Sequence, residues 1–100
     1  MEITTKKLAE QLKTDDAAQV LDVRELDEIR EGMVPGAMHI ALGELSDRLD
    51  QLDKTRPVFA VCRSGRRSAL AADQLTKAGF TAYNVTGGML DWADAGLPMD

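Results

Sequence analysis

Cys62, the only cysteine in the chain, opens the stretch of residues 62–68, which reads C-R-S-G-R-R-S. Four apolar residues at 58–61 are typical of a buried strand, and the apolar periodicity that starts at Ala69 predicts a helix behind the stretch. Backbone N–H groups in the first turn of a helix have no intrahelical acceptor and carry a partial positive charge. A cysteine that faces them, with arginines nearby, ionises more easily than an ordinary thiol. The stretch therefore predicts a thiolate nucleophile in an anion pocket, with Cys62 as the catalytic residue.

The six residues after the cysteine are expected to bind an anion or the modified sulfur: Arg63, Ser64, Gly65, Arg66, Arg67 and Ser68. The competing interpretation is a small buried cysteine at a strand end, where many free cysteines lie. A cationic loop disfavours that interpretation, because a core cysteine gains nothing from neighbouring arginines. Ser64 and Ser68 either donate hydrogen bonds to the sulfur or cap the helix, and both roles stay open.

Composition limits the partners and the location. The chain has 100 residues, 44% of them apolar and 29% charged, with a net charge of −5. We expect a single domain over residues 1–100. The acidic balance argues against nucleic acid, and no apolar run approaches the roughly 20 residues of a membrane span. No signal pattern opens the chain, so a cytoplasmic protein is expected. One cysteine permits neither an internal disulfide nor a cysteine-based metal site, and we expect no metal and no cofactor.

Strand patterns alternate with helix patterns along the whole chain. The predicted strands cover residues 1–3, 19–23, 37–41, 58–61 and 81–85. The predicted helices run from residue 4 or 5 to a turn at 15–16, over 25–31, over 45–52, from the cysteine loop to 78, and from 88 to about 95. This alternation predicts an α/β fold with a mainly parallel five-stranded sheet and helices on both faces. Ligands of such sheets bind beyond the carboxyl ends of the strands, where Cys62 is expected.

Asp22 and Arg24 follow the strand at 19–23 and are predicted to support the site from the same edge of the sheet. Asp22 fits a structural hydrogen bond at the strand end equally well. Arg24 has the alternative of pairing with Glu25 or Glu28 at the surface. Two other polar or aromatic side chains are expected in the core rather than in catalysis: His39 and Trp92.

Four segments together resemble a single-domain rhodanese, a sulfurtransferase. They are L-D-V-R-E at 21–25, E-G-x-x-P-G-A at 31–37 followed by H-I, C-R-S-G-R-R-S at 62–68, and G-G-x-x-x-W with A-G-L-P within 87–98. The resemblance implies a three-layer rhodanese-like α/β fold, Cys62 as nucleophile and a cradle of backbone N–H groups at 63–67. One departure is Met33, where the family often has histidine. It stands on a peripheral turn, so we expect little effect on the chemistry.

The resemblance also implies a reaction and its partners. A Cys62 thiolate attacks the outer sulfur of a small-molecule donor such as thiosulfate, sulfite leaves, and Cys62 becomes a persulfide. Cyanide or a thiol then accepts the sulfur, and a sulfur-accepting protein is a further candidate partner. No general base is needed, because the thiolate is already formed.

Four alternatives to this reaction differ in how well the residues fit them. A non-catalytic rhodanese-homology module that only binds a partner tends to have lost its cysteine, whereas Cys62 is present. A sulfur carrier in a multiprotein relay shares the persulfide. A cysteine phosphatase needs an arginine six residues after its cysteine to clamp a phosphoryl group, but Ser68 stands there and Arg67 comes one residue early. An arsenate reductase would need further cysteines, which the chain lacks.

Overall fold

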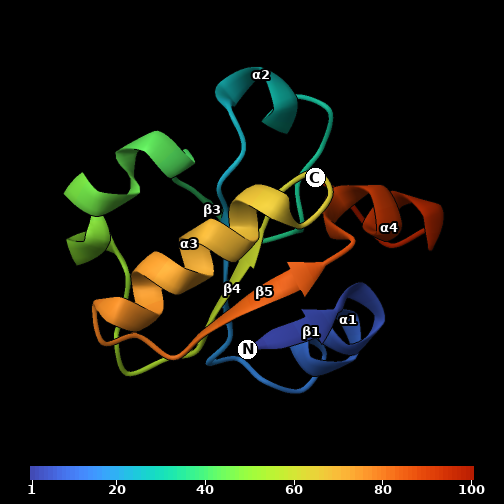
Figure 1. Cartoon of the computed structure of the whole chain (residues 1–100). Coiled ribbons are helices and arrows are strands. Elements are labelled where there is room, and N and C mark those ends of the chain that lie inside the picture. Colours follow the sequence, from blue (N-terminus) through green and yellow to red (C-terminus); the bar gives the residue numbers. More distant parts are fainter.

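An all-parallel five-stranded sheet forms the centre of the computed structural model, which describes residues 1–100 (Figure 1). Its strands lie in the order β1-β5-β4-β2-β3. They are β1 (Glu2–Thr4), β2 (Gln19–Asp22), β3 (Met38–His39), β4 (Val58–Val61) and β5 (Ala82–Thr86). The predicted five-stranded α/β sheet is confirmed, and it is entirely rather than mainly parallel. All carboxyl ends therefore meet at one edge of the sheet.

Helices cover both faces of the sheet, which confirms the layered arrangement (Figure 1). On one face α3 (Arg66–Lys77) packs beside the 3-10 helix η1 (Leu42–Asp47). On the other face α1 (Thr5–Leu12) packs against α4 (Gly88–Asp94). The short helix α2 (Leu26–Ile29) lies beyond the carboxyl end of β2. None of these helices combines the length and the apolar character that crossing a bilayer requires.

Strand β4 runs through the middle of the sheet, and all four of its residues are buried. Successive side chains of a strand point to opposite faces. Val58 and Ala60 therefore enter the core beneath α3, whereas Phe59 and Val61 enter the core shared with α1 and α4. Cys62 belongs to the first of these cores. The register of β4 thus delivers the sulfur to the side of the sheet on which α3 begins.

The helix predicted over residues 45–52 is wrong in type. The apolar positions do face the core, since Leu45 and Leu52 are buried and Leu49 packs against them. The backbone, however, forms two 3-10 helices, η1 and η2 (Leu49–Gln51), which are interrupted at Arg48 with φ −126°. Short connectors commonly adopt 3-10 geometry, and this segment contains weak helix formers: Gly43, Ser46, Asp47 and Asp50.

Element ends follow local chemistry. Thr4 caps α1, because its side-chain oxygen accepts the N–H of Lys7 at 3.2 Å. Glu25 and Glu28 form a capping box that starts α2. The helix predicted over 25–31 and the strand predicted over 37–41 are shorter than expected: α2 spans Leu26–Ile29 and β3 spans Met38–His39.

Candidate active site

Cys62 lies directly after β4, where the chain leaves the sheet and turns into α3. The cysteine is only 1% exposed, and its sulfur accepts the N–H of Gly65 with an N···Sγ distance of 3.1 Å. Gly65 has φ 103°, and a Cβ there would lie 3.3 Å from the backbone nitrogen of Gly87. The loop can therefore turn this tightly only because Gly65 has no side chain. The predicted strand, loop and helix N-terminus meet at the sulfur.

Hydrogen bonds make the Cys62 thiol easier to ionise. Burial is the largest single influence and raises the pKa of the thiol. The Ser68 hydroxyl and the backbone N–H groups of Ser68, Gly65 and Ser64 act in the opposite direction and together bring the pKa below its ordinary value. The first turn of α3 supplies part of this donor set, because its N–H groups have no acceptor within the helix. The sulfur is thus held by a polar cradle in an otherwise apolar core.

The N-terminus of α4 orients the loop from the other side. Met89 and Leu90 donate their N–H groups to the carbonyl oxygens of Cys62 and Arg63 at 2.9 and 3.0 Å. In a trans peptide the N–H points opposite to the C=O, so the N–H groups of residues 63 and 64 point away from α4. Gly88 permits the close approach, since a Cβ there would lie 2.3 Å from the Cys62 oxygen. The G-G pair before α4 therefore shapes the loop.

The three loop arginines have different surroundings. Arg67 donates two hydrogen bonds to the Glu28 carboxylate, of 2.6 and 2.8 Å. This contact, with smaller contributions from nearby backbone and charge, lowers the pKa of Glu28 from 4.5 to about 2. Arg63 and Arg66 are exposed and form no salt bridge. Arg63 and Arg66, two cations of the predicted anion site, therefore have no carboxylate partner. Arg67 is paired with Glu28, a contact that the sequence did not predict.

Arg24 is buried, in contrast to the surface pairing with Glu25 or Glu28 that the sequence left open. It is 4% exposed and forms a bidentate ion pair with Asp22, with an Nη2···Oδ2 distance of 2.8 Å. The same guanidinium donates to the backbone oxygens of Gly32 at 2.6 Å and of Glu28 at 3.2 Å. Because these contacts hold the carboxyl end of α2 and the turn that follows it, Asp22 and Arg24 position the segment that brings Glu28 to Arg67.

Ser68 and Asn84 form a buried polar link to the sulfur. The Ser68 Oγ lies 3.3 Å from the Cys62 sulfur, and it donates to Oδ1 of Asn84 at 2.6 Å. Ser68 does not cap α3, since Gly65 is the N-cap. Ser64 is exposed and contributes its backbone N–H rather than its hydroxyl. The sequence analysis missed Asn84, although a polar residue at an alternate position of the apolar strand β5 was a usable signal.

His39 and Trp92 were both expected in the core; Trp92 is buried, whereas His39 is half-buried. The Nε2–H of His39 donates to the carbonyl oxygen of Arg24 at 2.6 Å, because a carbonyl can only accept. Trp92 is 3% exposed, and its ring N–H donates to the carbonyl of Pro98 at 2.8 Å. Neither side chain forms a hydrogen bond with the Cys62 sulfur.

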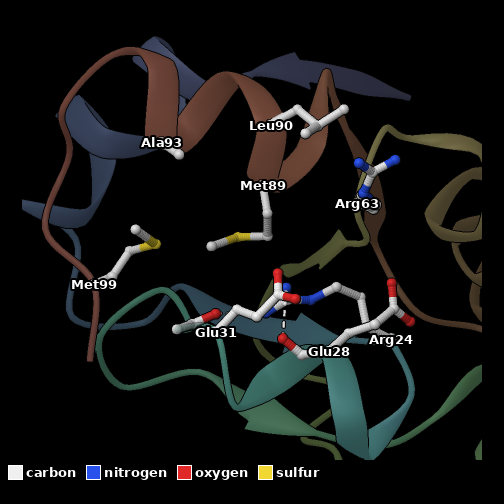
Figure 2. A pocket seen from close by; sticks show the side chains of 9 residues that line it. Arg24, Glu28, Glu31, Arg63, Met89, Leu90, Ala93 and Met99 are labelled. Atoms are coloured by element: carbon white, nitrogen blue, oxygen red, sulfur yellow. Dashed lines mark hydrogen bonds between the residues drawn. The ribbon is translucent and has the colours of Figure 1, made fainter.

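A hollow of about 220 Å³ opens beside the cysteine loop. Arg63 stands at its edge, and Figure 2 shows the thioethers of Met89 and Met99 pointing toward each other across it. Arg24 and Glu31 also contribute to the lining. Arg63 follows Cys62 directly, and Met89 donates its N–H to the Cys62 carbonyl, so the hollow adjoins the backbone of the cysteine loop. Cys62 itself does not line the hollow.

Known proteins resemble the chain over nearly its whole length. The family described as Rhodanese-like domain matches residues 4–95. The chain is 41% identical to the "Putative sulfurtransferase YtwF" of Bacillus subtilis, with 91% of this chain and 88% of the relative covered. It is 38% identical to the "Putative sulfur carrier protein YrkF" of the same organism. That match covers 91% of this chain and 50% of the relative. A crystal structure of a rhodanese-like domain protein from Staphylococcus aureus superimposes with a TM-score of 0.90 at 36% identity and covers 100% of this chain and 99% of that one. The chain therefore belongs to the rhodanese-like domain family.

Proposed function

We propose that the protein is a sulfurtransferase that carries sulfane sulfur as a persulfide on Cys62. The observation that carries the proposal is the position of the sulfur, which accepts the Gly65 N–H at 3.1 Å and lies 3.3 Å from the Ser68 hydroxyl at the start of α3. These donors favour a thiolate, the reactive form of a cysteine nucleophile. Family membership supports the same chemistry.

In the first half-reaction the Cys62 thiolate attacks the outer sulfur of a donor, and thiosulfate is the donor we propose. A sulfur–sulfur bond forms to Cys62, the bond between the two donor sulfurs breaks, and sulfite leaves with the electron pair. Arg63 and Arg66 are exposed and free of carboxylates, so they attract the dianion. The backbone N–H groups at the loop stabilise the negative charge on sulfur before attack and in the persulfide.

In the second half-reaction a thiolate or cyanide attacks the terminal sulfur of the persulfide. The persulfide bond breaks, the acceptor leaves as a persulfide or as thiocyanate, and the Cys62 thiolate returns. Neither half-reaction requires a general base, which agrees with a site in which His39 is bonded to a backbone carbonyl instead of the sulfur.

A sulfur-relay carrier is the second candidate, and it shares the Cys62 persulfide. It is favoured by the relative that is named a sulfur carrier and by the apolar rim of the hollow beside the loop. Leu90 and Met99 on that rim are 44% and 45% exposed, which offers a contact surface to an accepting protein. Steady-state turnover with small thiols distinguishes the two, because a dedicated carrier discharges its sulfur to a protein partner only.

The phosphatase alternative loses support from the geometry. The position six residues after the cysteine holds Ser68, whose hydroxyl contacts the sulfur. The arginine nearest to that position, Arg67, is bound by Glu28 through both of its terminal nitrogens. No guanidinium is left at this point to clamp a phosphoryl group.

Intact mass spectrometry after incubation with thiosulfate tests the proposal. We expect a gain of about 32 Da, one sulfur atom, which disappears on addition of cyanide or a thiol. Cys62→Ser is the matched control, since no other thiol exists in the chain, and it should show neither the gain nor turnover. A wild-type protein that gains no mass, or a Cys62→Ser protein that keeps more than a few per cent of the turnover, would overturn the assignment.

A further inference from the structure

Asn84 and Ser68 form a chain of two hydrogen-bonded side chains that ends on the Cys62 sulfur. Asn84 belongs to β5 and Ser68 to α3, and their exposures are 5% and 0%. The Ser68 Oγ is 2.6 Å from Oδ1 of Asn84 and 3.3 Å from the sulfur. A serine hydroxyl carries one proton, so Ser68 donates to only one of these neighbours at a time.

The arrangement with Oδ1 as acceptor suits the neutral thiol. Ser68 donates to Asn84, and the Ser68 oxygen accepts the S–H proton of Cys62. In the thiolate the sulfur accepts only, and so does Oδ1, and the single Ser68 proton cannot serve both. Either Oδ1 of Asn84 would then lose its donor, or the thiolate would keep only backbone N–H donors such as that of Gly65, and each loss is unfavourable inside a protein.

The amide of Asn84 is free to remove this conflict. Its Nδ2 group makes no hydrogen bond within the protein, and no buried side-chain nitrogen or oxygen lacks a partner, so Nδ2 reaches solvent. Asn84 also lines a surface hollow between β1 and α3. A half-turn about the last side-chain torsion exchanges two groups of nearly equal size and places Oδ1 in contact with water. The backbone stays fixed, because Asn84 is paired in the sheet with Glu2 and Ala60.

We propose that Asn84 is a positioning residue for Cys62, and that its amide turns when the thiol ionises. In the ionised form the Nδ2–H of Asn84 donates to Oγ of Ser68, and the Ser68 hydroxyl donates to the thiolate. The thiol proton leaves to solvent, Ser68 keeps its own proton, and no covalent bond changes. The inference rests on the proposed function, since it requires Cys62 to work as a thiolate.

Other charges near Cys62 are the same in every comparison that tests this inference. Those on the loop and on the elements packed around it are Arg63, Arg66, the Arg67 and Glu28 pair, the Asp22 and Arg24 pair, and Asp91 in the first turn of α4. Glu2 of β1 and Asp73 of α3 line the same hollow as Asn84. Tyr83 of β5 stacks on Phe59 and belongs to the opposite core. Substitution of Asn84 or Ser68 leaves all of these groups in place.

The rate at which iodoacetamide alkylates Cys62, followed against pH, tests the inference without any sulfur donor. In Asn84→Asp the carboxylate can only accept hydrogen bonds, so the Ser68 hydroxyl donates to it whether Cys62 is a thiol or a thiolate. We expect this substitution to slow alkylation at about pH 6 by at least about tenfold in a chain that keeps Ser68. In a Ser68→Ala chain only the added charge acts, and the slowing should be no more than about threefold. Equal slowing in the two chains would overturn the proposal.

Asn84→Leu tests the turn of the amide with a side chain of similar size that cannot hydrogen-bond. If the Asn84 amide were fixed with Oδ1 toward Ser68, it would compete with the Cys62 thiolate for the Ser68 hydrogen bond. Removal of the amide would then favour the thiolate and speed alkylation. We expect the rate to stay the same or to fall, and a faster reaction contradicts the proposal.

A measurement on the unsubstituted protein covers the case in which these variants do not fold. The side-chain N–H resonances of Asn84 should shift with the same midpoint as the Cys62 ionisation and should lose this dependence in Ser68→Ala. A pH-independent amide in the wild-type protein overturns the inference. Failure of sulfur transfer leaves these readouts intact, so the two proposals can fail separately.

Discussion

Arg67 in α3 and Glu28 in α2 are joined by two hydrogen bonds, of 2.6 and 2.8 Å. The pair connects the helix that begins at the cysteine loop to the short helix beyond β2. Arg24 holds the same short helix through the backbone oxygen of Glu28. Because Arg67 is neutralised in this way, the positive charge that an anionic donor meets comes mainly from Arg63 and Arg66.

Glu28→Gln should lower the free energy of unfolding at about pH 7 by about 1 kcal/mol, a value reduced for the partial exposure of both side chains. Arg67 lowers the pKa of Glu28 from 4.5 to about 2. A lowered pKa in the folded state stabilises the protein fully above about pH 4.5, and this contribution is lost as the pH falls toward 2. Urea unfolding at neutral pH and near pH 2 should therefore show a difference between variant and wild type that shrinks in acid.

Asp73→Asn is the matched control for this measurement. Asp73 pairs with Lys77 on the surface of α3 at 3.0 Å, and both side chains are more than half exposed, at 62% and 77%. Its loss should change stability by no more than a few tenths of a kcal/mol. If Glu28→Gln were as stable as Asp73→Asn at neutral pH, the pair would have no structural role.

Arg63→Ala and Arg66→Ala should each raise the KM for thiosulfate about three- to tenfold, with a smaller effect on kcat. Each removes an exposed cation without a carboxylate partner. Added salt should shrink the difference from wild type, because exposed charges are screened. Arg48→Ala removes a cation that pairs with Glu44 away from the loop, and serves as the control. Unchanged, salt-insensitive kinetics in both loop variants would show that these arginines do not attract the donor.

Sequence patterns were sufficient to predict the parallel sheet and the position of Cys62 at the carboxyl end of a central strand. The apolar run at 58–61 has no polar face, which is typical of a central strand of a covered sheet, and Gly65 marks the turn that follows it. The surroundings of the sulfur were predictable as well. A residue at the end of a strand that leads directly into a helix lies near the N-terminus of that helix.

Contacts between distant segments were not predictable. Asn84 reaches Ser68 across 16 residues of sequence, and Arg67 reaches Glu28 across 39. Arg24 was predicted to support the site, with a surface pairing to Glu25 or Glu28 left open, whereas its partner is Asp22 on the preceding strand and both are buried. A polar side chain on a buried strand shows that a partner exists, but only the packing of helices on the sheet identifies it.

Gly88→Ala should disable the site, whereas Gly96→Ala should not. Both glycines have positive φ, of 53° and 67°, so the two variants share the backbone strain of roughly 1 kcal/mol. A Cβ at position 88 would lie 2.3 Å from the Cys62 oxygen, whereas nothing lies within 4 Å of one at position 96. We expect Gly88→Ala to unfold at lower urea than Gly96→Ala and to lose persulfide formation. Equal stability with intact persulfide formation in both would mean that α4 does not shape the loop.

Loop length should separate sulfur transfer from phosphatase chemistry. In this chain the donors of Gly65 and Ser68 converge on the Cys62 sulfur, at 3.1 and 3.3 Å. A single persulfide sulfur fits such a cradle better than a tetrahedral phosphoryl group does. We therefore expect the wild-type protein to consume thiosulfate and to leave an aryl phosphate intact.

Insertion of one glycine between Gly65 and Arg66 should abolish sulfur transfer, because the donors no longer converge on the sulfur. The insertion also moves the arginine of position 67 to six residues after the cysteine, the register of a phosphatase loop. Adding Glu28→Gln removes the carboxylate that holds this guanidinium, so the combined variant is the one expected to gain weak aryl phosphate hydrolysis. Both activities should be measured in the wild type, the insertion variant and the combined variant. Faster hydrolysis of aryl phosphate than consumption of thiosulfate by the wild-type protein would refute the sulfurtransferase assignment.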